Sequence, residues 1–252
     1  MKITRAVVPS LFTTLNIFSG FLSITYSSQG EFNLAAWFII LAAIFDALDG
    51  IMARITKSSS QFGVELDSLA DVISFGAAPS FLVYQVYLHS LETWGIMISA
   101  MPLVFGAIRL ARFNVQLVGF DKEHFNGLPI PLQAITICSY VLQYCESATT
   151  NWTSGGLTAL VIFLSLLMVS KVKYDTLPKL TRRKIRTNLW KIIGLLCGLI
   201  IIIISKGTLF FLCLLTYIVF GLIRSIVGWI RRISAKQHEE PEEINELTSI
   251  DI

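Results

Sequence analysis

The chain has 252 residues, of which 54% are hydrophobic and 15% charged, and its formal net charge at pH 7 is +3. A mean hydropathy of +0.68 excludes an ordinary soluble globular domain and indicates a protein that crosses a membrane several times. The 4 cysteines show no metal-ligand spacing, so we expect no zinc site. We expect no nucleic-acid partner.

Apolar segments of spanning length recur along the chain, and they predict an all-α, polytopic membrane bundle of about eight transmembrane helices. The third of these segments is interrupted near its start by Asp67 and Asp71. The fifth segment is short. We expect one membrane domain over residues 1–232 and a polar cytoplasmic tail over residues 233–252. The predicted spans are residues 8–27, 33–53, 66–87, 93–112, 128–146, 154–171, 189–205 and 208–228.

Basic residues between these spans predict the orientation of the chain. If the N-terminus is cytoplasmic, the cytoplasmic loops hold nearly all of the loop lysines and arginines, and the opposite side offers only Lys206. This asymmetry obeys the positive-inside rule. We therefore expect an integral protein of the cytoplasmic (inner) membrane, with both termini and the functional site on the cytoplasmic side.

The segment from Asp46 to Asp71 reads DALDGIMARITKSSSQFGVELDSLAD and is unusually acidic for a membrane domain. Asp46 and Asp49 are three residues apart at the end of the second span, and Asp67 and Asp71 are four apart at the start of the third. Each pair therefore shares a helix face. The connection between the two helices is short, so we expect the four carboxylates to converge near the cytoplasmic interface.

Four carboxylates this close need a counter-charge, because carboxylates in a membrane are costly and are kept for function. Two divalent cations would balance them, and oxygen ligands favour Mg²⁺, Mn²⁺ or Ca²⁺ over zinc. Paired metals are a common device for phosphoryl chemistry. Gly50 and Gly63 would let a bulky ligand approach the backbone, and Arg54 can bind a phosphate through two hydrogen bonds.

Two other functions could use such carboxylates. A cation-coupled transporter would use them as an acidic pathway, but it does not explain why Gly50, Arg54 and Gly63 lie in register with them. An intramembrane prenyltransferase also binds magnesium diphosphate through aspartates, but it uses two well-separated motifs with a different spacing.

The acidic segment resembles the signature of the CDP-alcohol phosphotransferases at every position. These enzymes transfer a substituted phosphate from a CDP-linked donor to an alcohol and release CMP. The matching pattern is Asp46-x-x-Asp49-Gly50-x-x-Ala53-Arg54, eight residues, and then Gly63-x-x-x-Asp67-x-x-x-Asp71.

Further segments extend the resemblance over about the first 140 residues. Residues 9–16 are similar to an amino-terminal element of the family, from which Ser10 departs while Thr13 and Asn16 match. Three other strings resemble the phosphatidylserine synthase branch of the family. These strings are Ser74-Phe75-Gly76-Ala77-Ala78-Pro79, Arg109-Leu110-Ala111-Arg112-Phe113-Asn114 and Phe125-Asn126-Gly127-Leu128-Pro129-Ile130-Pro131.

The resemblance implies a role for each matching residue. Asp46, Asp49 and Asp67 would bind one divalent cation, and Asp46, Asp67 and Asp71 would contact a second. The CDP moiety would be held by Gly50, Arg54 and Ser60, with Thr13 and Asn16 as further candidates. Asp71 would be the general base. The resemblance also suggests a homodimer.

The branch implies CDP-diacylglycerol as donor and L-serine as acceptor. Serine carries a carboxylate, so its pocket should offer a cation, and Arg109 and Arg112 at the end of the fourth span are available with Asn114 beside them. Positive-inside anchoring explains these arginines as well. Glycerol 3-phosphate and inositol phosphate remain alternative acceptors.

Overall fold

A computed structural model of the chain describes residues 7–56, 60–118, 127–144, 151–170, 172 and 210–228. All regular structure in these ranges is helical, which confirms the predicted all-α class. A helix over Phe210–Gly228 follows the labelled elements. These are α1 (Val7–Ser28), α2 (Phe32–Thr56), α3 (Gln61–Asp71), the π-helix η1 (Val72–Ala77), α4 (Ala78–Val86), the 3₁₀ turn η2 (Leu88–Leu91), α5 (Glu92–Val118), α6 (Ile130–Tyr144) and α7 (Asn151–Val169).

Several of the described helices are suited to a bilayer, so the chain is a membrane protein. Helices α1, α6 and α7 coincide with three further predicted spans. The predicted span over 189–205 lies outside the described residues, so the total of eight stays a prediction. Within the described residues, 4 helical segments are long and apolar enough to cross a membrane, namely Phe32–Ala53, Gln61–Val86, Leu88–Val115 and Phe210–Gly228.

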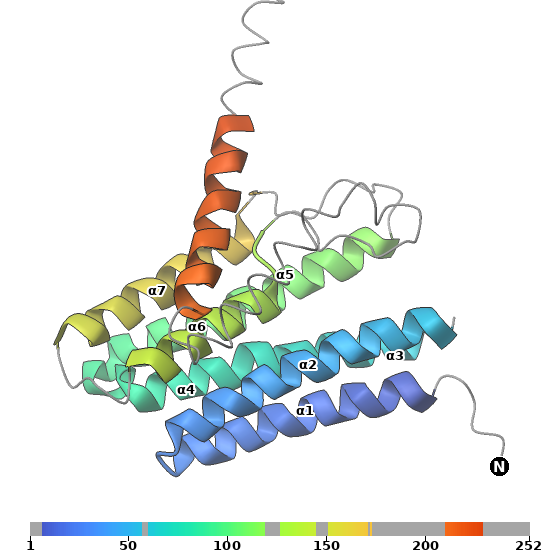
Figure 1. Cartoon of the computed structure of the whole chain (residues 1–252), viewed down its shortest axis with the longest axis horizontal. Helices are drawn as coiled ribbons and strands as arrows, with labels where there is room; N and C mark the ends of the chain where they lie inside the picture. Colours follow the sequence, from blue (N-terminus) through green and yellow to red (C-terminus); the bar gives the residue numbers. More distant parts are fainter. Residues whose placement is uncertain are drawn as a thin grey trace, which may run out of the picture.

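Helix α1, helix α2, the continuous span α3–η1–α4 and helix α5 run in alternating directions (Figure 1). In Figure 1, the N-terminal end of α1, the α2–α3 turn and the C-terminal end of α5 lie at the same end of the bundle. The helix over Phe210–Gly228, drawn in red, leaves the bundle at a steep angle. It contacts α6 through Phe211, whose ring meets the rings of Tyr140 and Tyr144 edge-on at 5.2 and 5.9 Å between centroids.

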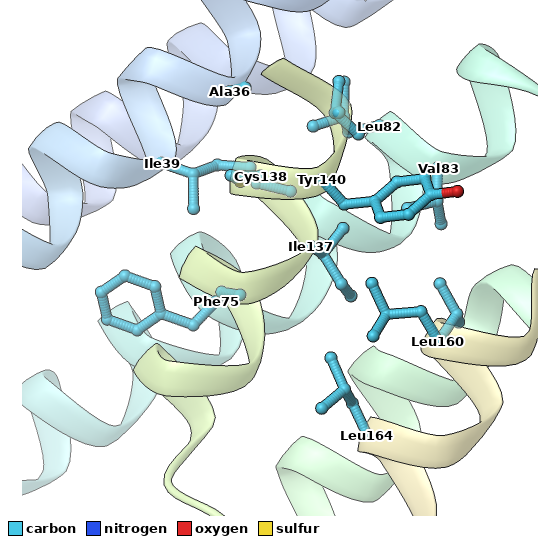
Figure 2. Packing of buried hydrophobic residues seen from close by; sticks show 14 of the residues in the cluster. Ala36, Ile39, Phe75, Leu82, Val83, Ile137, Cys138, Tyr140, Leu160 and Leu164 are labelled. Carbon is cyan, nitrogen blue, oxygen red and sulfur yellow. The ribbon is translucent and has the colours of Figure 1, made fainter. Parts of the chain in front are cut away.

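Helix α6 lies at the centre of the hydrophobic core. Figure 2 shows Cys138 of α6 next to Ile39 of α2 and Ile137 of α6 pointing toward α7, which carries Leu164; Phe75 of η1 belongs to the same cluster. All five side chains are fully buried. Lipid tails are as apolar as these side chains, so in a bilayer the association depends on close packing rather than on removal from water.

Helix α1 has an unusually polar buried face. Its small polar side chains lie three or four residues apart, as on one helical stripe, and let neighbouring helices approach closely. Gly20 lies against Ser74 of η1 so tightly that a Cβ at Gly20 would overlap Ser74. The Ser74 hydroxyl donates a hydrogen bond of 2.9 Å to the main-chain oxygen of Asn16. The buried polar residues of α1 are Thr13, Asn16, Ser19, Ser23 and Ser27.

The third span changes its winding directly after Asp71. From Val72 to Ala77 it is a π-helix, and the amide of Ala78 bonds back to Ile73. Pro79 follows and has no amide hydrogen to continue the ladder. π-Helical turns are rare and occur often at functional sites. Here the turn separates the carboxylate-bearing α3 from the buried α4.

The string around Gly127, noted in the sequence, joins α6 to the end of α7. Gly127 has a φ of 95°, and its amide donates to Val172 O at 2.8 Å, while the amide of Leu128 donates to Leu167 O at 3.1 Å. A Cβ on Gly127 would overlap the carbonyl oxygen of Met168. The glycine is therefore required both by its dihedral angle and by the lack of space.

Gly127→Ala should lower the free energy of unfolding by roughly 1–3 kcal/mol, because alanine is strained at this φ and its methyl group has no room. Thermal unfolding in detergent measures the effect. Gly155→Ala in α7 is the matched control, because a Cβ there meets nothing within 4 Å. Equal melting temperatures for the two variants would contradict this account.

Candidate metal and phosphate site

Three carboxylates meet at the end of the bundle that carries the α2–α3 turn. One carboxylate oxygen from each of Asp46, Asp67 and Asp71 lies within 4.8 Å of the other two. Asp46 comes from α2, and the other two come from α3. Only residues 57–60 separate Thr56 from Gln61, so the short turn brings the two faces together as expected.

The three carboxylates repel one another and also feel Asp49. The one cation that acts on them in the described part of the site is Arg109 of α5, whose charge interacts with that of Asp71. Four negative charges thus face a single positive charge. Such an excess is costly in a membrane domain unless further cations bind.

Asp49 is turned toward α1 and is buried. Its Oδ2 accepts a short hydrogen bond from the hydroxyl of Thr13. Asp49 follows Asp46 by three residues, which rotates it by about 60° around the helix axis. The rotation explains why Asp49 lies at the edge of the cluster, and the bond makes Thr13 a residue that orients a carboxylate.

Asn16 lies one turn below Thr13 and is completely buried. Neither its amide nitrogen nor its amide oxygen has a hydrogen-bond partner among the described residues. A buried amide without partners is costly, which suits a side chain that meets a polar ligand or water.

The residues expected to hold the CDP moiety belong to the C-terminal part of α2 and to the start of α3. Gly50 is exposed, and the space where its Cβ would stand is open to at least 4 Å. Ser60 is the N-cap of α3, and its Oγ accepts a hydrogen bond of 3.0 Å from the amide of Gly63. Arg54 lies in α2, and the prediction for its side chain falls outside what the structure describes.

The two arginines of α5 have different surroundings. Arg109 is partly buried, its charge interacts with that of Asp71, and its Nε has no hydrogen-bond partner among the described residues. Arg112 is exposed. The structure therefore brings Arg109 to the carboxylates and leaves Arg112 at the helix surface.

Asn114 contacts a residue that sequence reasoning did not single out. Its Nδ2 donates a hydrogen bond of 3.0 Å to the hydroxyl of Ser68 on α3. Ser68 lies between Asp67 and Asp71, about 60° around the helix from Asp71. That proximity to two expected ligands was the signal available in the sequence.

The donor set fits a hard divalent cation. All the converging ligand atoms are carboxylate oxygens, which Mg²⁺ and Mn²⁺ prefer. The Oδ1 atom of Asp71 is buried and has no hydrogen-bond partner among the described residues, as expected of an oxygen that coordinates a metal ion. The exposed Gly50 leaves room for a larger ligand beside the three carboxylates.

Comparisons with known proteins agree with this geometry. Residues 6–172 match the family model described as CDP-alcohol phosphatidyltransferase. The chain is 35% identical, over 90% of its own length and 94% of the relative's, to a CDP-diacylglycerol–serine O-phosphatidyltransferase of Helicobacter pylori. A protein with the same name from Methanocaldococcus jannaschii is 39% identical, over 86% of this chain and 92% of the relative.

A third relative carries a different name. It is the archaetidylserine synthase of Methanothermobacter thermautotrophicus, which is 40% identical over 69% of this chain and 72% of its own length. The family generally uses divalent cations, which agrees with the carboxylate cluster. The matched region contains the three converging aspartates, Thr13 and Arg109, and the chain belongs to the CDP-alcohol phosphatidyltransferase family.

Proposed function

We propose that this protein transfers a phosphatidyl group from CDP-diacylglycerol to the hydroxyl of L-serine, giving phosphatidylserine and CMP. The observation that carries the proposal is the meeting of Asp46, Asp67 and Asp71 with Arg109 beside Asp71. A carboxylate cluster next to a partly buried cation suits a phosphate donor and an acceptor that bears a carboxylate. The names of the relatives support the same pair of substrates.

Two divalent cations, Mg²⁺ or Mn²⁺, belong to this proposal. Asp46, Asp49 and Asp67 would hold one, and Asp46, Asp67 and Asp71 the other. When bound, the ions supply positive charge to the phosphate oxygens and to the leaving CMP. The bond from Thr13 holds Asp49 in one orientation, which is the usual role of a hydrogen bond behind a metal ligand.

The donor lies along the α2–α3 turn in this proposal. Gly50 admits the pyrophosphate, Arg54 binds a phosphate, and Ser60 contributes a hydroxyl at the start of α3. Thr13 and Asn16 of α1 lie under the same site. Because α2 and α3 carry both the carboxylates and these groups, donor binding places the reacting phosphorus beside Asp71.

Asp71 is the general base. It takes the proton of the serine hydroxyl, and the serine oxygen forms a bond to the phosphorus that bears the diacylglycerol. The bond from that phosphorus to the oxygen shared with the second phosphate breaks, and CMP leaves with the electron pair. Arg54 stabilises the charge that develops on the leaving group.

Arg109 binds the carboxylate of serine in this proposal. A guanidinium matches a carboxylate through paired hydrogen bonds, and the buried Nε of Arg109, which has no hydrogen-bond partner among the described residues, is available for this. Arg112 is exposed and serves as a membrane-side anchor or an outer contact. Glycerol 3-phosphate or inositol phosphate would need more cationic groups facing Asp71 than Arg109 supplies.

The proposal includes the place of the protein in the cell. We propose the cytoplasmic membrane, with both termini and the site on the cytoplasmic side, because the loop charges obey the positive-inside rule. We also propose a homodimer, a membrane domain over residues 1–232 and a tail over residues 233–252.

Purified protein given CDP-diacylglycerol should release CMP with L-serine and release much less with glycerol 3-phosphate or inositol phosphate. The three acceptors are offered separately, and CMP is measured by chromatography. Faster release with either phosphate acceptor would reassign the substrate. No release with any of them would favour a transporter.

Asp71→Asn should lower kcat by roughly 10²–10⁴-fold, because the amide cannot take the proton from serine. Glu65→Gln is the matched control, since Glu65 is an exposed carboxylate of the same helix and its loss should leave turnover unchanged. Melting temperatures of both variants confirm folding. Normal CMP release by Asp71→Asn would remove Asp71 as the base.

Manganese should raise the melting temperature of the protein in detergent, because an ion that binds only the folded state stabilises it, by about 2.7 kcal/mol at a hundredfold excess over Kd. Asp67→Asn should lose most of this shift, and Glu65→Gln should keep it. A chelator should reverse the shift and stop CMP release. An equal shift in Asp67→Asn would place the ion elsewhere.

A further inference from the structure

Ser68 makes a side-chain link between two helices of the site. Its Oγ donates a hydrogen bond of 3.1 Å to Val64 O and accepts one of 3.0 Å from the Nδ2 of Asn114. Ser68 and Asn114 are both partly buried. The hydroxyl also lies 3.4 Å from the Oδ1 of Asn114, so both amide atoms of Asn114 are within hydrogen-bond distance of Ser68, and the shorter contact is the bond from Nδ2.

The two linked helices pack chiefly against different neighbours. Helix α3 lies against α1 and continues into η1, whereas α5 lies against η1, η2, α4 and α7. The hydrogen bond between Ser68 and Asn114 therefore ties α5 to α3 at the end of the bundle where the carboxylates meet. Figure 1 shows both helices reaching this end.

The hydrogen bond between Ser68 and Asn114 lies next to the two groups that the acceptor would meet, further toward the end of the bundle. Ser68 precedes Asp71 by three residues on α3, and Asn114 follows Arg109 by five residues on α5. The charges of Asp71 and Arg109 already interact across the same gap. Any movement of the α5 end relative to α3 changes the distance between the base and the guanidinium.

We infer that Ser68 is a positioning residue for the acceptor: through Asn114 it holds the end of α5 against α3 and sets the spacing between Asp71 and Arg109. This inference rests on the proposed function, in which Asp71 takes the hydroxyl proton of serine and Arg109 binds its carboxylate. Asn114 then acts through Ser68. A fixed spacing selects an acceptor whose hydroxyl and carboxylate are as close together as they are in serine.

The donor side does not depend on this tie. The groups proposed for CDP lie on α2 and at the start of α3, and the metal ligands lie on α2 and α3. Loss of the tie should therefore weaken acceptor binding and spare the donor and the ions, which a general loss of folding would not do.

Ser68→Ala should raise the KM for L-serine roughly fivefold, the value of one hydrogen bond. It should leave the KM for CDP-diacylglycerol, the Mn²⁺ dependence and the melting temperature unchanged. Ser68→Thr keeps the hydroxyl and should restore the KM for serine to near the wild-type value. Steady-state CMP release with each substrate varied in turn measures all of these constants.

The double variant of Ser68→Ala and Asn114→Ala tests whether the two side chains act as one unit. Its KM for serine should be no higher than that of Asn114→Ala alone, because the bond can be lost only once. Multiplied effects in the double variant would overturn the inference. An unchanged KM for serine in Ser68→Ala, or a Ser68→Thr variant as impaired as Ser68→Ala, would also overturn it.

The same assay separates this inference from the proposed function. If the wild-type protein releases no CMP with serine, the proposed function itself fails, and the inference falls with it. If the wild type uses serine and Ser68→Ala does so with an unchanged KM, only the inference fails.

Discussion

The main physical constraint on this structure is the repulsion between carboxylates that lie close together at one end of a membrane bundle. This repulsion must be offset by positive charge. Only residues 57–60 separate α2 from α3, α3 packs against α1, and Asp46 of α2 meets Asp67 and Asp71 of α3. Four aspartates near a bilayer are tolerable only with positive charge beside them. Arg109 of α5 supplies part of this positive charge. The converging ligand atoms are all carboxylate oxygens, which suit divalent cations as the source of the rest.

Two helices around the acidic segment, α1 and α5, supply side chains that interact with it. From α1, Thr13 donates to Asp49 and holds it at the edge of the cluster. From α5, Arg109 brings its charge to Asp71, and Asn114 bonds Ser68. The π-helical turn after Asp71 lets the same span carry a polar site at one end and a closely packed segment at the other. The apolar packing around α6 then keeps α2, η1 and α7 in place.

Two residues that are three positions apart on the same helix can have different roles. This limits how much of the site could be predicted from the sequence. Asp46 and Asp49 share a face, as do Arg109 and Arg112, yet in each pair one member faces the cluster centre and the other does not. Three residues along a helix leave a rotation of about 60°, which is enough to turn a side chain toward another neighbour. How each helix is rotated about its axis is decided by packing between helices, which no local pattern reveals.

The sequence by itself determined the features that act over short distances along the chain: apolar segments of spanning length, helices throughout the described chain, and a short connection predicted to bring four aspartates together, of which three meet. Only the tertiary structure decided which side chains of distant segments meet these aspartates. Thr13 is 36 residues from Asp49, and Ser68 is 46 from Asn114. Such pairs form only when each helix packs with a particular rotation about its axis and a particular position along it. Both are set by the packing of all the helices in the bundle together.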